Sequence, residues 1–158
     1  MADMSMNASG SSAGSLDQVR LAAARALARA AHYGQTDKAG LPYVTHPQRV
    51  AGSLEDSTAQ IVALLHDTLE DTMLTEEDLR PVFGDEITDA VVAMTHLETE
   101  SYMEYVHRLG ANALARRVKL ADLKDNMRRD RLPVIRPEDE ERLRRYEEAK
   151  AYLESLDT

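Results

Sequence analysis

The chain has 158 residues, 43% of them hydrophobic and 30% charged, which predicts a single soluble globular domain. It has no cysteine, which excludes disulfides, thiolate catalysis and cysteine-bound metals. The net charge is −9 with no basic stripe, so we expect no nucleic-acid partner, although a small anionic substrate needs only a few local cations. No apolar run is long enough to cross a bilayer, so we expect no membrane partner and a cytoplasmic location.

The first third of the chain predicts a leader, a helix and a loop. Residues 1–15 are small and polar, so we expect a disordered leader before a folded domain over residues 16–156. Apolar residues recur at intervals of three and four from Leu16 to His32, and Gly34 follows, which predicts an amphipathic helix. Residues 34–43 indicate an ordered loop, after which Pro47 can occupy the first turn of a short helix.

The central segment, residues 63–72, reads ALLHDTLEDT. No glycine or proline interrupts residues 53–80, so we expect one helix that is apolar on most faces and therefore buried. In such a helix His66 lies above Glu70, and Asp67 lies above Asp71. Burying several carboxylates is costly unless a cation compensates them, so a divalent metal is the favoured explanation. The alternative is a solvated helix end at which His66 is only a cap.

The remaining chain predicts more helices and no strand. Asp56 and Asn112 are expected N-caps, and Thr75 with Asp78 resembles a capping box. We expect helices over residues 75–83, 85–96, 100–109, 113–129 and, after a proline-marked linker, 138–156. The last helix can dock on the body of the protein or on a second subunit, which leaves a homo-oligomer open. The predicted fold is all-α, with seven or eight helices in one domain.

Histidine and aspartate recur on three of these helices in the order His46, His66-Asp67 and Asp122. Two imidazoles and two carboxylates suit Mn²⁺, Fe²⁺, Zn²⁺ or Mg²⁺, and four protein ligands leave positions for water and substrate. Such a metal polarises a phosphoryl group and lowers the pKa of bound water. The neighbouring Glu70 could then accept or deliver protons, as could Asp71. Taken alone, His46 is more typical of a capping residue and Asp122 of a solvated one.

Three segments in this order resemble the HD superfamily of metal-dependent phosphohydrolases, and within it the RelA/SpoT-type hydrolase domains and small alarmone hydrolases. They are HYGQTDKAGLPYVTHPQRVA (32–51), ALLHDTLEDT (63–72) and VKLADLKDNM (118–127), and the resemblance spans about residues 16–130. It implies a helical bundle around one metal, usually Mn²⁺, and hydrolysis of the 3′-diphosphate of (p)ppGpp to GDP or GTP and pyrophosphate.

The resemblance also implies roles for individual residues. The metal ligands would be His46, His66, Asp67 and Asp122. The acidic pair beside the attacking water would be Glu70 and Asp71. Near the substrate, Lys38 would contact the phosphates and Asn126 the nucleotide.

The chain departs from the family pattern at two places. Asp37 stands where the family commonly has a basic residue associated with packing on guanine, and Leu41 replaces a glutamate. Leu123-Lys124-Asp125 stands where Arg-Leu-His is frequent. Asp37 favours a second hypothesis, an HD-type phosphohydrolase acting on another nucleotide phosphate ester. A third is a catalytically idle nucleotide-sensing module. Because the chain ends after the hydrolase-like part, we expect no synthetase activity.

Overall fold

The computed structural model describes residues 8–128 and 134–157, and helices account for most of them. The helices are α1 (Ala8–Ala31), α2 (Thr45–Gly52), α3 (Ser57–Leu65), α4 (Thr68–Asp71), α5 (Glu76–Ala93), α6 (Tyr102–Gly110), α7 (Ala113–Asn126) and α8 (Pro137–Ser155). In this part of the chain the only β-type pairing is an isolated bridge between Thr36 and Pro42, which confirms the predicted all-α fold. Within it, no helix is both long and apolar enough for a bilayer crossing.

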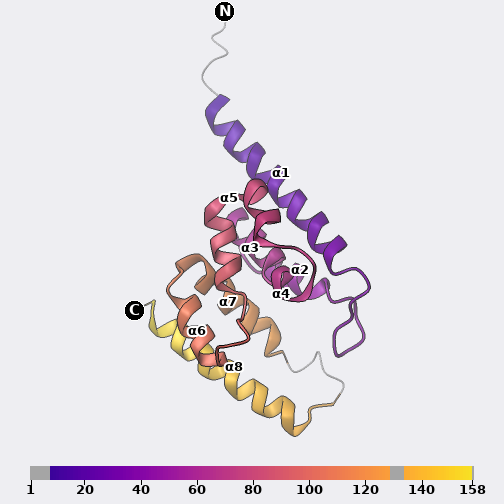
Figure 1. Cartoon of the computed structure of the whole chain (residues 1–158), viewed down its shortest axis with the longest axis vertical. Helices are drawn as coiled ribbons and strands as arrows, with labels where there is room; N and C mark the ends of the chain where they lie inside the picture. The colour runs from indigo at the N-terminus through magenta and orange to yellow at the C-terminus, as the bar shows by residue number, and fades with distance from the viewer. Residues whose placement is uncertain (1–7, 129–133, 158) are drawn as a thin grey trace, which may run out of the picture.

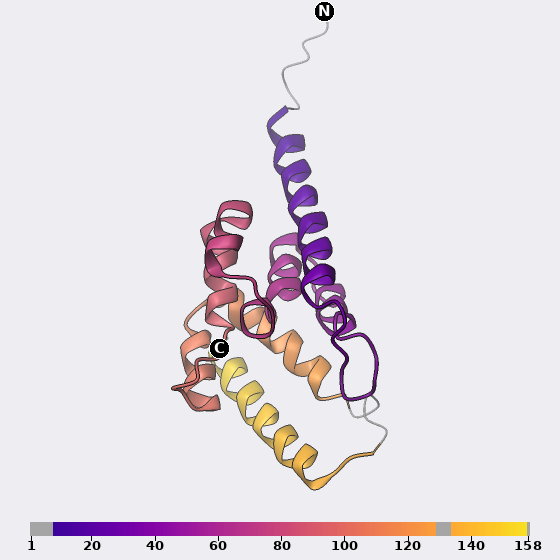
Figure 2. The same ribbon diagram turned by 45° about the vertical axis from the view of Figure 1, so that its right-hand side comes forward.

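Helix α3 forms the centre of the bundle because its second half is apolar on every face. From Ile61 to Leu65 each side chain is at most 2% exposed. Helices α1, α2, α5 and α7 all pack against α3, and the small side chains of Ala24 and Ala28 belong to the same core on the α1 side. Figures 1 and 2 show α3 enclosed in this way, while the first turns of α1 project beyond the other helices.

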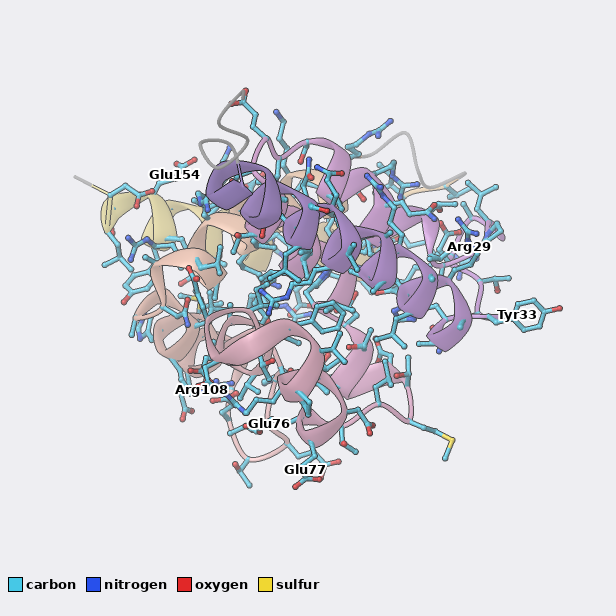
Figure 3. All side chains as sticks on the ribbon, turned by 90° about the horizontal axis from the view of Figure 1, so that it is seen from above. Arg29, Tyr33, Glu76, Glu77, Arg108 and Glu154 are labelled. Atoms are coloured by element: carbon cyan, nitrogen blue, oxygen red, sulfur yellow. The ribbon has the colours of Figure 1, made fainter. Side chains whose placement is uncertain are left out.

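A second, smaller core lies where α6, α7 and α8 meet. It contains Val106 and Leu109 of α6, Leu123 of α7 and Leu153 of α8. Helix α7 therefore contributes to both cores, and α8 crosses the end of the molecule opposite to the projecting end of α1 (Figure 1). Charged side chains such as Glu77 lie at the periphery (Figure 3).

The predicted helix starts are confirmed where a side chain caps the helix. Asp56 accepts a hydrogen bond from a backbone N–H in the first turn of α3, and Asn112 does the same for α7. Thr75 and Asp78 form a complete capping box at the start of α5. These bonds satisfy N–H groups that a helix leaves without an internal partner.

The predicted start of the first helix needs correction, whereas the predicted break at Gly84 is confirmed. Helix α1 begins at Ala8, so residues 8–15 are helical and not a disordered leader, while residues 1–7 lie outside the described residues. No proline interrupts residues 8–15, and extending an existing helix orders only one residue for each new hydrogen bond. The two helices expected over residues 75–83 and 85–96 are both present as the two halves of α5, because the backbone at Gly84 is non-helical, with φ at 83°, and kinks the helix there.

The prediction of an unbroken helix through residues 63–72 is wrong. Helix α3 ends at Leu65, and the short α4 starts at Thr68. His66 Nδ1 lies 2.5 Å from the carbonyl oxygen of Ala63, and the Thr68 hydroxyl donates to the carbonyl oxygen of Leu65 at 2.7 Å. Side-chain donors thus take over carbonyls at the end of α3, which allows the backbone to turn at His66 and Asp67.

Candidate metal centre

Three separate parts of the chain meet in the interior at the four predicted ligand residues. His46 lies on α2, His66 and Asp67 lie between α3 and α4, and Asp122 lies on α7. His46, His66 and Asp122 are each at most 3% exposed, and their potential ligand atoms lie within 4.8 Å of one another. Asp67 joins them because its Oδ2 is 3.1 Å from His66 Nε2.

The carboxylate of Asp122 is the common partner in this cluster. Its Oδ1 lies 2.8 Å from His46 Nε2 and 3.2 Å from His66 Nε2. The buried ammonium group of Lys119 donates to Oδ2 at 2.9 Å, and the Asn126 amide donates to Oδ1 at 3.3 Å. Oδ1 therefore faces the two imidazoles, while Oδ2 accepts the hydrogen bond from Lys119. Lys119 was not predicted as a site residue. The only indication in the sequence is its position one helical turn before Asp122.

The surroundings of the two ring nitrogens of His66 indicate whether a cation fits in this cluster. Its Nδ1 donates to the carbonyl oxygen of Ala63, so a neutral ring carries its lone pair on Nε2. Nε2 is buried and forms no hydrogen bond of good geometry, yet carboxylate oxygens of Asp67 and Asp122 lie 3.1 and 3.2 Å away. A lone pair facing two anionic oxygens is unfavourable without a positive charge between them. A proton on Nε2 or a divalent metal can supply that charge, and the mixed nitrogen and oxygen donors suit a divalent metal.

The pKa shifts point to the same conclusion. Burial alone would raise the pKa of Asp122, but Lys119 and His66 hold it well below its usual value. Burial also opposes ionisation of Asp67, yet His66 lowers the pKa of Asp67 to about 2. Conversely, burial alone would lower the pKa of His66, but the charges of Asp67 and Asp122 raise it well above the ordinary value. The site keeps its carboxylates ionised and attracts positive charge to the imidazole Nε2 atoms.

The acidic pair of the motif lies beside this cluster. Carboxylate oxygens of Asp67, Glu70 and Asp71 lie within 4.8 Å of one another. Burial and the neighbouring charge of Asp67 raise the pKa of Glu70 and that of Asp71. Glu70 also accepts a hydrogen bond from the backbone N–H of His96, which fixes its position. Carboxylates with raised pKa values are suited to accepting and returning a proton.

A cavity of about 300 Å³ opens next to the cluster. Tyr43 lines it and donates its hydroxyl proton to Asp67, so the cavity adjoins the cluster of candidate ligands. The two predicted substrate contacts, Lys38 and Asn126, also line it. Three further residues of the wall were not predicted from the sequence: Arg128, Arg142 and Tyr146.

The charge of the cavity wall is mostly basic, and part of it comes from α8. Arg142 lies on α8 and forms an ion pair of 2.5 Å with Asp139. The 60%-exposed side chain of Lys38 approaches the same aspartate at 3.7 Å. Such a wall suits an anionic ligand. Helix α8 lies beyond the three sequence motifs, which explains why its contribution was missed.

Asp37, the main departure from the family pattern, has a structural role in its own loop. Its Oδ1 accepts hydrogen bonds from the backbone N–H groups of Ala39 and Leu41, at 2.9 and 3.0 Å. This is the local pattern by which aspartate stabilises turns. The residue still lines the cavity, but one of its carboxylate oxygens is engaged by the loop.

The fold and the cluster define a helical-bundle protein with a buried imidazole–carboxylate centre suited to a divalent metal. Residues 24–136 match the model of the family described as HD domain, so the chain belongs to this family.

Proteins with related sequences and structures carry consistent descriptions. The chain is 34% identical over 145 residues to the bifunctional (p)ppGpp synthase/hydrolase SpoT of Escherichia coli K12, an alignment that covers 82% of this chain and 20% of SpoT. It is 36% identical over 115 residues to a GTP pyrophosphokinase of Myxococcus xanthus, with 61% and 15% covered. The chain thus spans a fifth or less of the length of these relatives.

A solved structure has a similar fold along nearly its whole length. It is described as a metazoan ortholog of SpoT that hydrolyses ppGpp and plays a role in starvation responses. Its TM-score is 0.69, its sequence identity is 25%, and the alignment covers 85% of this chain and 84% of that one.

Proposed function

We propose that this chain is a divalent-metal-dependent phosphohydrolase that removes the 3′-diphosphate of (p)ppGpp, giving GDP or GTP and pyrophosphate. The observation that carries the proposal is the convergence of two buried imidazoles and two carboxylates next to a cavity with basic residues. The names of the relatives and of the structural neighbour support this choice of substrate.

The proposed ligands are His46, His66, Asp67 and Asp122, and the proposed metal is Mn²⁺. The mixed nitrogen and oxygen donors suit Mn²⁺, although they also suit other divalent ions. A bound divalent ion supplies a polarised phosphoryl oxygen and a water of lowered pKa.

Glu70 and Asp71 are the proposed proton-transfer groups. When the water oxygen bonds to the phosphorus attached to the ribose 3′-oxygen, the carboxylate of Glu70 or Asp71 accepts the proton that the water loses. The bond between this phosphorus and the 3′-oxygen breaks, and the carboxylic acid that formed returns its proton to the 3′-oxygen. The products are the 5′-nucleotide and pyrophosphate.

The cavity is the proposed binding site for the nucleotide. Lys38 and Arg142 line it and can neutralise phosphate charge, while Asn126 offers an amide close to the proposed metal ligand Asp122. Tyr43 holds Asp67 in place through its hydroxyl group.

Asp37 supports a second candidate, hydrolysis of another nucleotide phosphate ester by the same centre. Its carboxylate lines the cavity and stabilises the loop, and it does not provide the basic group that would pack on guanine. The metal chemistry is unchanged in this alternative, and the substrate differs in its base and in the phosphate ester that is hydrolysed.

A substrate panel with Mn²⁺ separates the two candidates. We expect the purified chain to release pyrophosphate and GDP from ppGpp, measured by anion-exchange chromatography, and to leave GMP and GTP intact. The His66→Ala protein, matched for concentration and folding, should release nothing. Orthophosphate release from simple nucleotides, with ppGpp untouched, would favour the second candidate. No turnover of any compound by the Mn²⁺-loaded chain would refute both.

A further inference from the structure

The Nδ1 side of the His46 ring is hydrogen-bonded to a residue for which the sequence predicted no role. His46 Nδ1 lies 2.7 Å from Oδ2 of Asp125, a residue of α7 that is only 7% exposed. On the other side of the ring, Nε2 faces Asp122 at 2.8 Å. Both ring nitrogens of His46 therefore point at aspartates of the same helix, one turn apart.

Arg49 fixes the orientation of the Asp125 carboxylate. Its Nε donates to Oδ1 at 3.0 Å and its Nη2 donates to Oδ2 at 3.2 Å. Arg49 lies three residues after His46 on α2, so both side chains reach α7 from one face of that helix. Rotation of the carboxylate would break the bonds to the guanidinium and the bond to the imidazole together.

We propose that Asp125, oriented by Arg49, is a positioning residue that holds the proton of His46 on Nδ1 and thereby directs the Nε2 lone pair to the metal. A metal-bound histidine that donates its other N–H to a carboxylate is held in one tautomer and one ring orientation, and its basicity rises. Asp125 would perform this function for His46, as the carbonyl group of Ala63 does for His66.

The inference rests on the proposed function, because it assumes a metal at the four ligands. It adds that metal affinity depends on a residue that is not a ligand. It also gives a reason for aspartate at position 125: a carboxylate can accept from Nδ1–H and pair with Arg49 at the same time.

The first test measures Mn²⁺ and Zn²⁺ affinity by competition with a chelating dye. Loss of an outer partner of a metal-bound histidine typically costs 10–100-fold in affinity, so we expect a loss of that size for Asp125→Ala. Asp125→Asn keeps an acceptor oxygen for Nδ1–H and should lose less. Arg49→Gln removes the ion pair but keeps the bond to the imidazole, and should also lose less. Arg117→Gln is the matched control, because it breaks a different ion pair of α7, with Asp56.

The second test observes the hydrogen bond itself in the Zn²⁺-loaded protein, which is diamagnetic. We expect a downfield, slowly exchanging Nδ1–H proton signal of His46 in the wild type and in the Arg117→Gln control. In Asp125→Asn the signal should move upfield, and in Asp125→Ala it should disappear. If the alanine variant does not fold, the asparagine variant decides, because an unmoved signal with wild-type affinity would overturn the proposal.

Two other results overturn the proposal. One is wild-type metal affinity in folded Asp125→Ala. The other is an equal loss of affinity in Arg49→Gln and Asp125→Ala, because the ion pair between helices would then account for the effect without His46. If the wild-type chain binds neither Mn²⁺ nor Zn²⁺, the metal centre and the proposed function fail as well.

Discussion

At the scale of single residues, the two imidazole rings of the site are oriented in the same way. The Nδ1 atom of His66 points to a backbone carbonyl and that of His46 to a carboxylate, while both Nε2 atoms face Asp122. The Nδ1 acceptor is a neutral carbonyl for His66 and a carboxylate for His46. Lys119 donates to Oδ2 of Asp122 and offsets part of the negative charge of that carboxylate. The four proposed ligands are therefore held in position by their neighbours before any substrate arrives.

Replacing Glu70 separates proton transfer from metal binding. Glutamine has the shape of glutamate and can still accept from the His96 N–H, but it takes up no proton. We expect Glu70→Gln to bind Mn²⁺ as the wild type does, while kcat for ppGpp falls by about 100-fold or more, which is typical for loss of a general base. Steady-state kinetics and metal titration measure the two effects. The control is Glu77→Gln, an exposed residue of α5 (Figure 3), and wild-type kcat in Glu70→Gln would contradict the assigned role.

At the scale of elements, the loop from α5 to α6 is closed by one ion pair. Arg108 of α6 donates to both carboxylate oxygens of Glu100, at 2.6 and 3.0 Å, and its guanidinium also donates to the carbonyl oxygen of Thr95 at 2.7 Å. His96, whose N–H binds Glu70, lies in the same loop. The ion pair therefore stabilises both the helix junction and a contact of the candidate site.

This ion pair predicts a pH dependence of stability. The hydrogen bonds from Arg108 lower the pKa of Glu100 from 4.5 to about 2. The unfolded chain then binds the proton more readily than the folded protein, so the stabilisation is complete above about pH 4.5 and is lost as the pH falls toward 2. We expect the difference in urea midpoint between wild type and Glu100→Gln to shrink over that interval. The neighbouring exposed Glu98→Gln is the control, and a difference that is constant with pH would contradict the prediction.

At the scale of the whole molecule, the candidate site joins segments that are distant in the sequence. His46 and Asp122 are separated by 76 residues, and the helices that carry them, α2 and α7, pack against each other and against the buried α3. A metal bound by α2, α7 and the turn after α3 would therefore cross-link the bundle. Ligands that bind only the folded state stabilise it by mass action.

Metal addition should accordingly raise the thermal unfolding midpoint. At 100 times its dissociation constant a metal contributes about 2.7 kcal/mol, which for a domain of this size is roughly 5–10 °C. Differential scanning fluorimetry with and without Mn²⁺ measures the shift, and a chelator should reverse it. The His66→Ala protein should show no shift. A shift of the same size in that variant would place the bound metal elsewhere.

The sequence by itself determined the features that depend on neighbours along the chain. Helical periodicity, the caps at Asp56, Thr75 and Asn112, and the order of the histidine and aspartate motifs all follow from residues within one or two turns. The all-α class followed from these, and the motif order together with the family resemblance supplied the predicted ligands and substrate contacts.

Only the tertiary structure decided which distant groups meet. The approach of Asp125 to His46 and the contribution of Arg142 and Tyr146 from α8 to the cavity depend on how helices pack. A local pattern shows which face of a helix is apolar, but it does not show which polar side chain of another helix lies opposite a given residue. The partners of a buried charge are set by packing between elements, and for that reason they were found in the structure and not in the sequence.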